Sequence, residues 1–326
     1  MDFARASSLP WLRESQAALL RLREQSRLPH ALLIPAREGV GAEPLAQWMA
    51  AVSLCESAAA PCGRCASCAL LRADNHPDLH QVEREEDAQQ VKIEQVRELI
   101  DALHYTSFRG GYKVGILFGA ERLNAAGANA FLKTLEEPSP QTLLMLVAAP
   151  NHRLPATIAS RCHKLPVPIP DGAQAIAWLG EQGIERSQAA LRLALAQGAP
   201  LVALEFSAEI VQSLNQEMSR DLAQLEAARI DPSLAAERWL KSDFALRLRW
   251  LENWITDRVR VLSAGDAASL KSVDVVGLSG ALLKAKIRTL FRFLDEVREL
   301  KRLVTTSANM QLALEGVLIG QFIQDR

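Results

Sequence analysis

The first half of the chain alternates short, strand-like runs with longer segments in which apolar residues recur every three or four positions. The strand-like runs are Ala31 to Ile34, Asp78 to Val82, Lys113 to Phe118 and Leu143 to Ala148. Short and mostly continuous apolar runs are typical of strands buried on both faces, as in a parallel sheet covered by crossover helices. The pattern therefore predicts an α/β domain over residues 1–166.

The sequence changes character at Leu165 to Pro170, where three prolines alternate with apolar residues. Proline removes backbone donors and biases the preceding residue toward extended geometry, so this stretch predicts a linker. Helical periodicity follows, first in an Ala- and Leu-rich unit over 167–206 and then in long segments over 207–326. The last region includes a stripe that predicts a helix facing either a bundle core or an interface. Its members are Ile287, Leu290, Phe291, Leu294 and Val297.

Composition excludes several classes of protein. Hydrophobic residues make up 49% and charged residues 23% of the chain, the balance of an ordinary globular protein. No apolar stretch approaches the roughly 20 residues of a membrane-spanning helix, and Asp2 and Arg5 interrupt any secretory signal. We therefore expect a cytoplasmic protein without membrane contact. The net charge of −1 and the 5% of aromatic residues argue against a self-sufficient nucleic-acid binder.

A glycine-containing segment follows the first strand-like run. Gly39 and Gly41 have the small size that a phosphate-binding loop needs, but Ala42 and Glu43 stand where such a loop carries a Lys and a hydroxyl for Mg²⁺. The lost cation and the added carboxylate both oppose nucleotide binding. Without further context the two glycines are equally typical of an ordinary tight turn.

Four of the five cysteines lie close together in the sequence, at Cys55, Cys62, Cys65 and Cys68. Two successive Cys-x-x-Cys steps are typical of tetrahedral Zn²⁺ coordination, and the absence of a nearby His or carboxylate ligand favours a closed, structural site. Disulfides are the poorer alternative in a reducing compartment, whereas an iron–sulfur cluster would accept the same ligands. A metal-free cluster of reduced thiols is the main alternative to zinc. Cys162 is interpreted as a core residue.

The chain resembles the clamp-loader branch of the AAA+ proteins, and within it the δ′ subunits of bacterial DNA polymerase III, over nearly its whole length. The residues that carry the resemblance are Leu28-Pro29-His30-Ala31-Leu32-Leu33, His76-Pro77-Asp78, Lys113-Val114, the run from Asn129 to Pro138, and Ser160-Arg161-Cys162. The resemblance implies an AAA+ P-loop-type domain over 1–166 with a zinc insertion at 55–68. It also implies a small helical lid over 167–206 and a helical collar over 207–326.

Active members of that family carry a full phosphate loop, an acidic pair after the third strand and an arginine in the lid. The matching positions here are Ala42, Glu43, Phe118, Gly119 and Leu201. The resemblance therefore implies a subunit that binds no nucleotide and has no catalytic activity of its own. It also implies that Arg161, next to Ser160, is an arginine finger acting in trans on a neighbour's γ-phosphate. The alternative for Arg161 is an ordinary surface ion pair.

The resemblance also implies partners. They are ATPase subunits of the γ/τ type and a δ-type subunit in a heteropentamer and, through that complex, a sliding clamp and primer-template DNA during replication. Two other hypotheses remain. An active AAA+ ATPase or helicase-like motor is opposed by Ala42, Glu43, Phe118 and Gly119, and a zinc-finger DNA-binding protein is opposed by the scarcity of basic residues around the cysteines.

Overall fold

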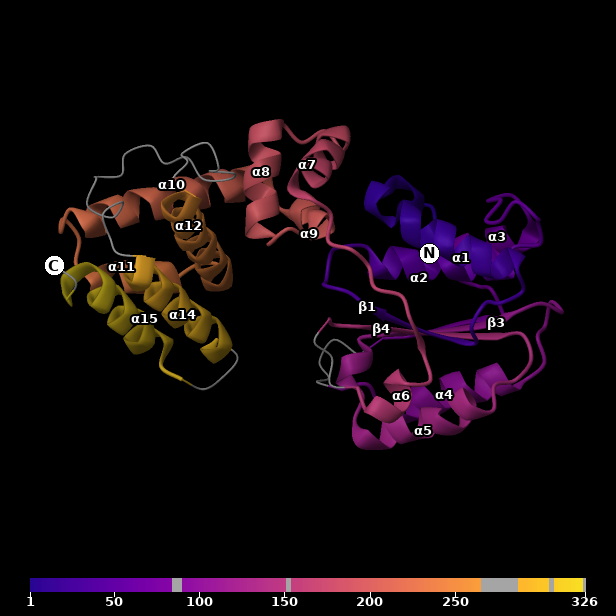
Figure 1. The fold of residues 1–326 in the computed structure, drawn as a ribbon. Coiled ribbons are helices and arrows are strands. Elements are labelled where there is room, and N and C mark those ends of the chain that lie inside the picture. Colours follow the sequence, from indigo (N-terminus) through magenta and orange to yellow (C-terminus); the bar gives the residue numbers. More distant parts are fainter. Residues whose placement is uncertain (84–89, 151–153, 265–286, 305–307, 325–326) are drawn as a thin grey trace. The chain divides into compact units, whose positions relative to one another are not determined.

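A computed structural model describes residues 1–83, 90–150, 154–264, 287–304 and 308–324 (Figure 1). The chain divides into two compact units, Met1–Pro170 and Asp171–Arg326. The first unit contains a parallel sheet with helices, and the described part of the second is helical. The α/β fold class and the helical C-terminal region are thus confirmed, while the proposed division into three domains stays a prediction.

The sheet of the first unit has five strands in the order β2-β3-β4-β1-β5, and all neighbours are parallel. The strands are β1 (Ala31–Pro35), β2 (Leu79–Val82), β3 (Lys113–Phe118), β4 (Thr142–Ala148) and β5 (His163–Lys164). Every residue of β3 and β4 is buried, which explains why the sequence pattern detected these strands as continuous apolar runs.

Helices cover both faces of this sheet (Figure 1). One face carries α1 (Arg13–Glu24), α2 (Ala42–Leu54) and α3 (Ala66–Arg72), and the other carries α4 (Ile93–His104), α5 (Ala125–Glu136) and α6 (Ala156–Ala159). Helix α4 approaches β3 closely at Gly115, where an added Cβ would lie 3.0 Å from the nearest side-chain atoms of Leu99 and Leu103. Glycine at this position therefore sets how near the helix lies to the sheet.

Three short 3₁₀ segments, Arg5–Ser8, Pro10–Leu12 and Ala120–Arg122, complete the regular structure of the first unit. The strand predictions agree with the structure to within one residue at each end. Strand β5 was missed because it has only two residues, both exposed, and so leaves no apolar run in the sequence.

The second unit begins with α7 (Gly172–Glu181), α8 (Arg186–Leu195) and α9 (Pro200–Glu205), followed by α10 (Ala208–Glu226), α11 (Pro232–Leu240) and α12 (Phe244–Ala264). It ends with α14 (Ile287–Leu303), α15 (Met310–Ile319) and a π-helical turn, Gly320–Gln324. Its core contains Trp239, Trp250 and Phe293, and the two indole N–H groups donate to Asp221 and Asn215. Among the described residues, no helix is both long enough and apolar enough to cross a membrane.

The stripe predicted for α14 needs one correction. Leu290, Leu294 and Val297 are buried as expected, but Phe291 is 46% exposed. Phe293 occupies the core instead, because it lies three residues after Leu290 and so shares its face of the helix. The side chain of Ile287 lies outside the described residues.

Candidate functional site

The glycine segment joins β1 to α2 and depends on left-handed backbone conformations. Gly39 has φ 75° and Gly41 has φ 104°, a region that residues with a Cβ rarely adopt. Gly41 is also the N-cap of α2, which begins at Ala42. Both glycines are therefore required by the conformation of the turn itself.

The N-terminal segment packs against this turn. A Cβ added to Gly41 would lie 2.8 Å from Leu9 Cδ1 and 3.1 Å from Leu12 Cδ1, and both leucines are fully buried. Beside them, the indole Nε1 of Trp11 donates to the carbonyl oxygen of Val40 at 2.7 Å. The turn is thus part of the apolar core of the first unit.

The positions matched to nucleotide-binding groups are mostly apolar. Ala42 and Phe118 are 7% and 6% exposed, and Glu43 is exposed on the first turn of α2. Gly119, with φ 68°, turns the chain after β3, while Leu201 lies buried in the second unit on α9. None of these side chains carries a positive charge that could neutralise polyphosphate. The carboxylate of Glu43 is the only one that could bind Mg²⁺, and it repels phosphate.

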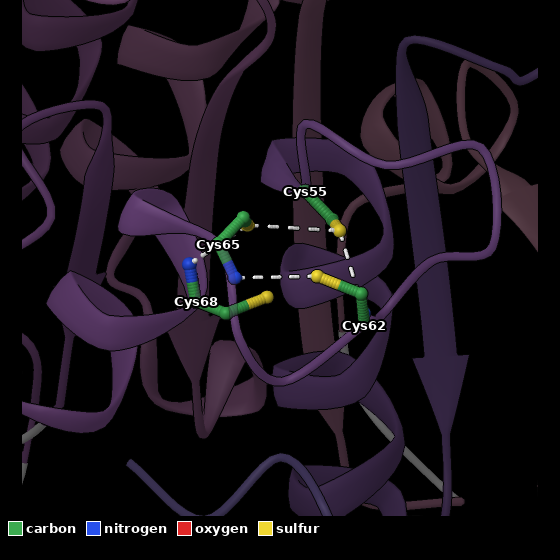
Figure 2. A group of neighbouring side chains, drawn as sticks. All are labelled: Cys55, Cys62, Cys65 and Cys68. Atoms are coloured by element: carbon green, nitrogen blue, oxygen red, sulfur yellow. Dashed lines mark hydrogen bonds between the residues drawn. The ribbon is translucent and has the colours of Figure 1, made fainter.

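The four clustered cysteines come together around one point (Figure 2). Cys55 ends α2, Cys62 lies in the following loop, Cys65 is the N-cap of α3, and Cys68 lies in that helix. All four sulfur atoms lie within 4.8 Å of one another, and those of Cys55 and Cys65 are 3.9 Å apart. The structure therefore brings together the complete predicted ligand set.

Burial and backbone contacts give the thiols of the cluster different pKa values. The amide N–H groups of Arg64 and Cys65 lower the pKa of Cys62 to about 6, whereas burial raises the pKa of Cys68 to about 12. Further amides donate to sulfur at 3.4 Å, from Ser57 and Cys62 to Cys55 and from Cys68 to Cys65. Such N–H···S contacts favour thiolates, the form that binds metal.

The cluster fits a tetrahedral metal ion. Zn–S bonds of about 2.3 Å place the sulfurs of a tetrahedral site roughly 3.8 Å apart, close to the 3.9 Å between Cys55 and Cys65. Cys68 is fully buried and Cys55 is 7% exposed, so two of the ligands are removed from solvent. All five cysteines are free thiols, and Cys162 lies in the core as predicted. The cysteine cluster can therefore hold a metal ion.

The cysteine cluster is joined to the loop between α4 and β3. The carboxylate of Glu56 accepts from Ser67 Oγ at 2.8 Å and from Arg109 Nη2 at 2.6 Å. These contacts lower the pKa of Glu56, with the Arg109 hydrogen bond the larger cause. Because Glu56 follows Cys55, the position of Arg109 depends on the local fold of the cluster.

A second carboxylate, which is buried, holds the loop between α4 and β3 through hydrogen bonds. Asp78, only 2% exposed, accepts from the amides of Phe108 and Arg109 at 2.7 and 3.1 Å and from Ser107 Oγ at 3.1 Å. The loop nevertheless exposes Phe108 to 80%. The sequence marked Asp78 only as the start of a strand-like run and as part of a family motif, so its role in the loop was missed.

Arg161 lies in the turn between α6 and β5, on the surface of the first unit. Its Nη2 donates to Glu136 Oε1 at 2.6 Å and its Nη1 donates to the carbonyl oxygen of Thr157 at 2.9 Å. Ser160 Oγ donates to the same carbonyl at 3.2 Å. The arginine side chain is 36% exposed. Within this unit it thus forms the surface ion pair that the sequence left as an alternative, with a partner that the sequence did not identify.

The sequence matches two families along its length. Residues 13–170 match the family described as "DNA polymerase III, delta subunit". Residues 203–321 match "DNA polymerase III, delta subunit, C terminal". Together these two matches leave only the termini and residues 171–202, which contain α7, α8 and the start of α9, outside a family match.

Individual relatives agree with these matches. The chain is 33% identical to DNA polymerase III subunit delta' of Pseudomonas aeruginosa over 322 residues, 96% of this chain and 97% of that one. It is 30% identical to the delta' subunit of Escherichia coli K12 over 325 residues, 95% of this chain and 94% of that one. A shorter similarity, 35% over 138 residues, covers 42% of this chain and 21% of DNA polymerase III subunit tau of Salmonella typhimurium.

Proposed function

Because the chain belongs to the family of DNA polymerase III delta' subunits, we propose that it is a clamp-loader subunit that presents Arg161 to the γ-phosphate on a neighbouring ATPase subunit. In this role it binds no nucleotide and has no catalytic activity of its own, although it is a component of a DNA polymerase holoenzyme. A cytoplasmic location follows from that role.

The proposed partners are ATPase subunits of the γ/τ type and a δ-type subunit in a heteropentamer. Through this complex the chain helps to place a sliding clamp on primed DNA. The similarity to a tau subunit supports a common fold between this chain and one class of partner. Subunits of related fold can pack side by side in a ring through equivalent interfaces.

The observation that carries the proposal is the placement of Arg161. Its side chain is 36% exposed, while the neighbouring Ile158 and Cys162 are 0% and 8% exposed and belong to the core. A planar guanidinium projecting from a fixed backbone can enter an adjacent active site and stabilise negative charge on the transferring phosphate.

The absence of nucleotide chemistry is supported by the glycine turn. Ala42 and Glu43 supply neither the cation nor the hydroxyl of a phosphate loop, and buried Leu9 and Leu12 contact Gly41. Phosphate binding by this turn would require both new side chains and displacement of the N-terminal segment. An active ATPase is therefore the weaker hypothesis.

We also propose that Cys55, Cys62, Cys65 and Cys68 hold a structural Zn²⁺. The sulfur separations and the lack of an open ligand position in a four-cysteine set support this assignment. When bound, zinc supplies folding free energy to a segment with few apolar residues of its own. The cysteines fix the end of α2 relative to α3 and, through Glu56, the position of Arg109.

The test of the proposal compares wild-type chain with Arg161→Ala in a reconstituted clamp loader. With clamp and primed DNA present, steady-state ATP hydrolysis should fall by at least about tenfold, because arginine fingers contribute large factors to phosphoryl transfer. Subunit assembly is measured by sedimentation and should not change. Arg122→Ala is the control, since Arg122 is also an exposed arginine close to a glutamate, Glu121, at 3.8 Å.

Unchanged hydrolysis by the Arg161→Ala complex would reject the finger role and leave a purely architectural subunit. ATP hydrolysis by the isolated chain would reject the non-catalytic assignment. A similar loss for Arg122→Ala would attribute the effect to general surface charge.

A further inference from the structure

Glu136 is the last residue of α5 and lies against the side chain of Arg161, from which it is separated by 25 residues in the sequence. The contact between Arg161 Nη2 and Glu136 Oε1 measures 2.6 Å, the short distance of a charge-assisted hydrogen bond. The second terminal nitrogen, Nη1, donates to the carbonyl of Thr157 at 2.9 Å. Glu136 and Thr157 together define one orientation of the guanidinium.

A carboxylate at this position is unfavourable for the helix alone. The C-terminal end of a helix carries partial negative charge, so acidic side chains there are disfavoured and cations are preferred. Glu136 is followed by a second acid, Glu137, which is the C-cap of α5. The cation of Arg161 offsets this local cost, which gives a physical reason for the pairing.

Hydrogen bonds and burial hold the backbone around Arg161, so only the side chain of Arg161 can change its orientation. The amide of Arg161 donates to the carbonyl of Ile158 at 3.0 Å, and Cys162 is buried immediately after it. Three residues after Cys162, the amide of Leu165 donates to the carbonyl oxygen of Leu33 of β1 at 2.9 Å. An arginine side chain carries considerable rotamer entropy, so an orienting contact is useful when the guanidinium has to meet a phosphate.

The ion pair is weak enough to be exchanged. The side chains of Arg161 and Glu136 are 36% and 52% exposed, and exposed ion pairs contribute little to stability because water and salt screen the two charges. A buried pair would hold the guanidinium against a competing anion, whereas this exposed pair orients it without sequestering it. The guanidinium also keeps further N–H donors beyond those that contact Glu136 and Thr157.

We propose that Glu136 is a positioning residue for Arg161: it holds the guanidinium in the orientation from which it meets the neighbouring subunit's γ-phosphate. This inference rests on the proposed function. It assigns to the first acid of the Glu136-Glu137 pair a role in catalysis on the adjacent subunit, although Glu136 itself touches neither nucleotide nor metal. The chemistry of the reaction is unchanged, and only the population of competent Arg161 orientations depends on Glu136.

The first experiment uses the isolated chain and is independent of the loader. Phenylglyoxal modification of each arginine is followed by peptide mass spectrometry in wild type, Glu136→Ala and Glu137→Ala. Loss of Glu136 should raise the modification rate of Arg161 by about two- to fivefold, the range that an exposed ion pair of ordinary strength allows. Glu137→Ala is the matched control and should leave the rate unchanged. Equal Arg161 rates in all three proteins would overturn the inference.

The second experiment measures ATP hydrolysis in the reconstituted loader. Glu136→Ala should lower kcat by about three- to tenfold at unchanged KM, a smaller loss than that of Arg161→Ala, because misorientation is less costly than removal. Glu136→Gln keeps an oxygen acceptor, so its kcat should lie between those of Glu136→Ala and wild type. Glu137→Ala should behave as wild type.

The outcomes separate the inference from the function on which it rests. A loss with Arg161→Ala and none with Glu136→Ala overturns the positioning role and leaves the finger role intact. Faster hydrolysis by Glu136→Ala also overturns it, because the carboxylate would then inhibit the finger. No loss with Arg161→Ala removes the finger role and the inference together.

Discussion

Gly41 is the residue at which backbone strain and packing act together. Its φ of 104° disfavours any side chain, and an added Cβ would approach Leu9 Cδ1 to 2.8 Å. We expect Gly41→Ala to lower the free energy of unfolding by about 2 kcal/mol or more, from the combined cost of strain and overpacking. Urea unfolding of the purified chain measures this directly.

Gly110→Ala provides the matched control for this prediction. Gly110 also has a positive φ, of 73°, but an added Cβ would meet nothing within 4 Å. Gly110→Ala should lower the free energy of unfolding only through backbone strain, by on the order of 1 kcal/mol. Equal losses for the two variants would show that contact with Leu9 and Leu12 contributes nothing at Gly41.

His76 gives the first unit a predicted dependence on pH. The side chain is 5% exposed and accepts from the amide of Asp78 through Nδ1 at 3.1 Å, which requires the neutral ring. Burial lowers the pKa of His76 below 6.5, with Arg109 acting in the same direction and the charges of Asp78 and Glu56 opposing it. The unfolded chain therefore takes up the proton first as the pH falls.

The contribution of His76 to the free energy of unfolding is fully present above its pKa in the unfolded chain, about 6.5. It is lost as the pH falls toward the lower pKa of His76 in the folded chain. The slope cannot exceed about 1.4 kcal/mol per pH unit for one titrating group. His76→Asn keeps an acceptor for the Asp78 amide without titrating. The variant should lose less stability than wild type between about pH 7 and about pH 5 in thermal melts. Parallel pH profiles would contradict the assignment.

The loop between α4 and β3 depends on Asp78 for its conformation. Asp78→Asn removes the charge from the hydrogen bonds to Ser107, Phe108 and Arg109. Hydrogen bonds to a charged group contribute about 1.5–3 kcal/mol each, so amide exchange at Phe108 and Arg109 should accelerate by at least about tenfold. Hydrogen-exchange mass spectrometry tests this, with the exposed Asp101→Asn on α4 as control. Unchanged exchange would mean that the loop is held by other contacts.

The whole segment from Cys55 to Arg72 should need bound metal to keep its folded structure. Cys65→Ser removes a ligand, and we expect loss of bound zinc together with loss of exchange protection over α3. Strands β3 and β4, all of whose residues are buried, should keep their protection. Metal content is measured by atomic spectrometry. Cys162→Ala, which changes a cysteine outside the cluster, should retain the metal, and a metal-loaded Cys65→Ser protein would refute the ligand set.

Strands and the cysteine cluster were predictable because their signals are local. The six consecutive buried positions of β3 appear in the sequence as a mostly apolar run, and the spacing of Cys62, Cys65 and Cys68 indicates a ligand set. The pairing of Glu136 with Arg161 and the bond from Trp11 to Val40 were not predictable, since they join residues 25 and 29 positions apart. Periodicity reports which face of an element is apolar, but it does not report which distant side chain meets that face.

At the scale of the whole molecule, each compact unit has its own core. The core of the second unit, with Trp239, Trp250 and Phe293 at 0–1% exposure, is drawn from residues after Asp171 alone. We expect a fragment of residues 171–326 to fold with helical circular dichroism and a cooperative thermal transition. A fragment that stays unfolded would show that the second unit needs the first for its stability.

The packing of the N-terminal segment over Gly41 also bears on what a phosphate-binding loop at this turn would require. Replacing Ala42 and Glu43 with a lysine and a threonine would restore the side chains of a phosphate loop, but Leu9 and Leu12 would still lie against the turn. Moving those leucines would expose apolar surface and lose the bond from Trp11 to Val40. Under the proposed function, nucleotide binding would therefore require changes both in the turn and in the N-terminal segment, and the second change would remove packing that stabilises the first unit.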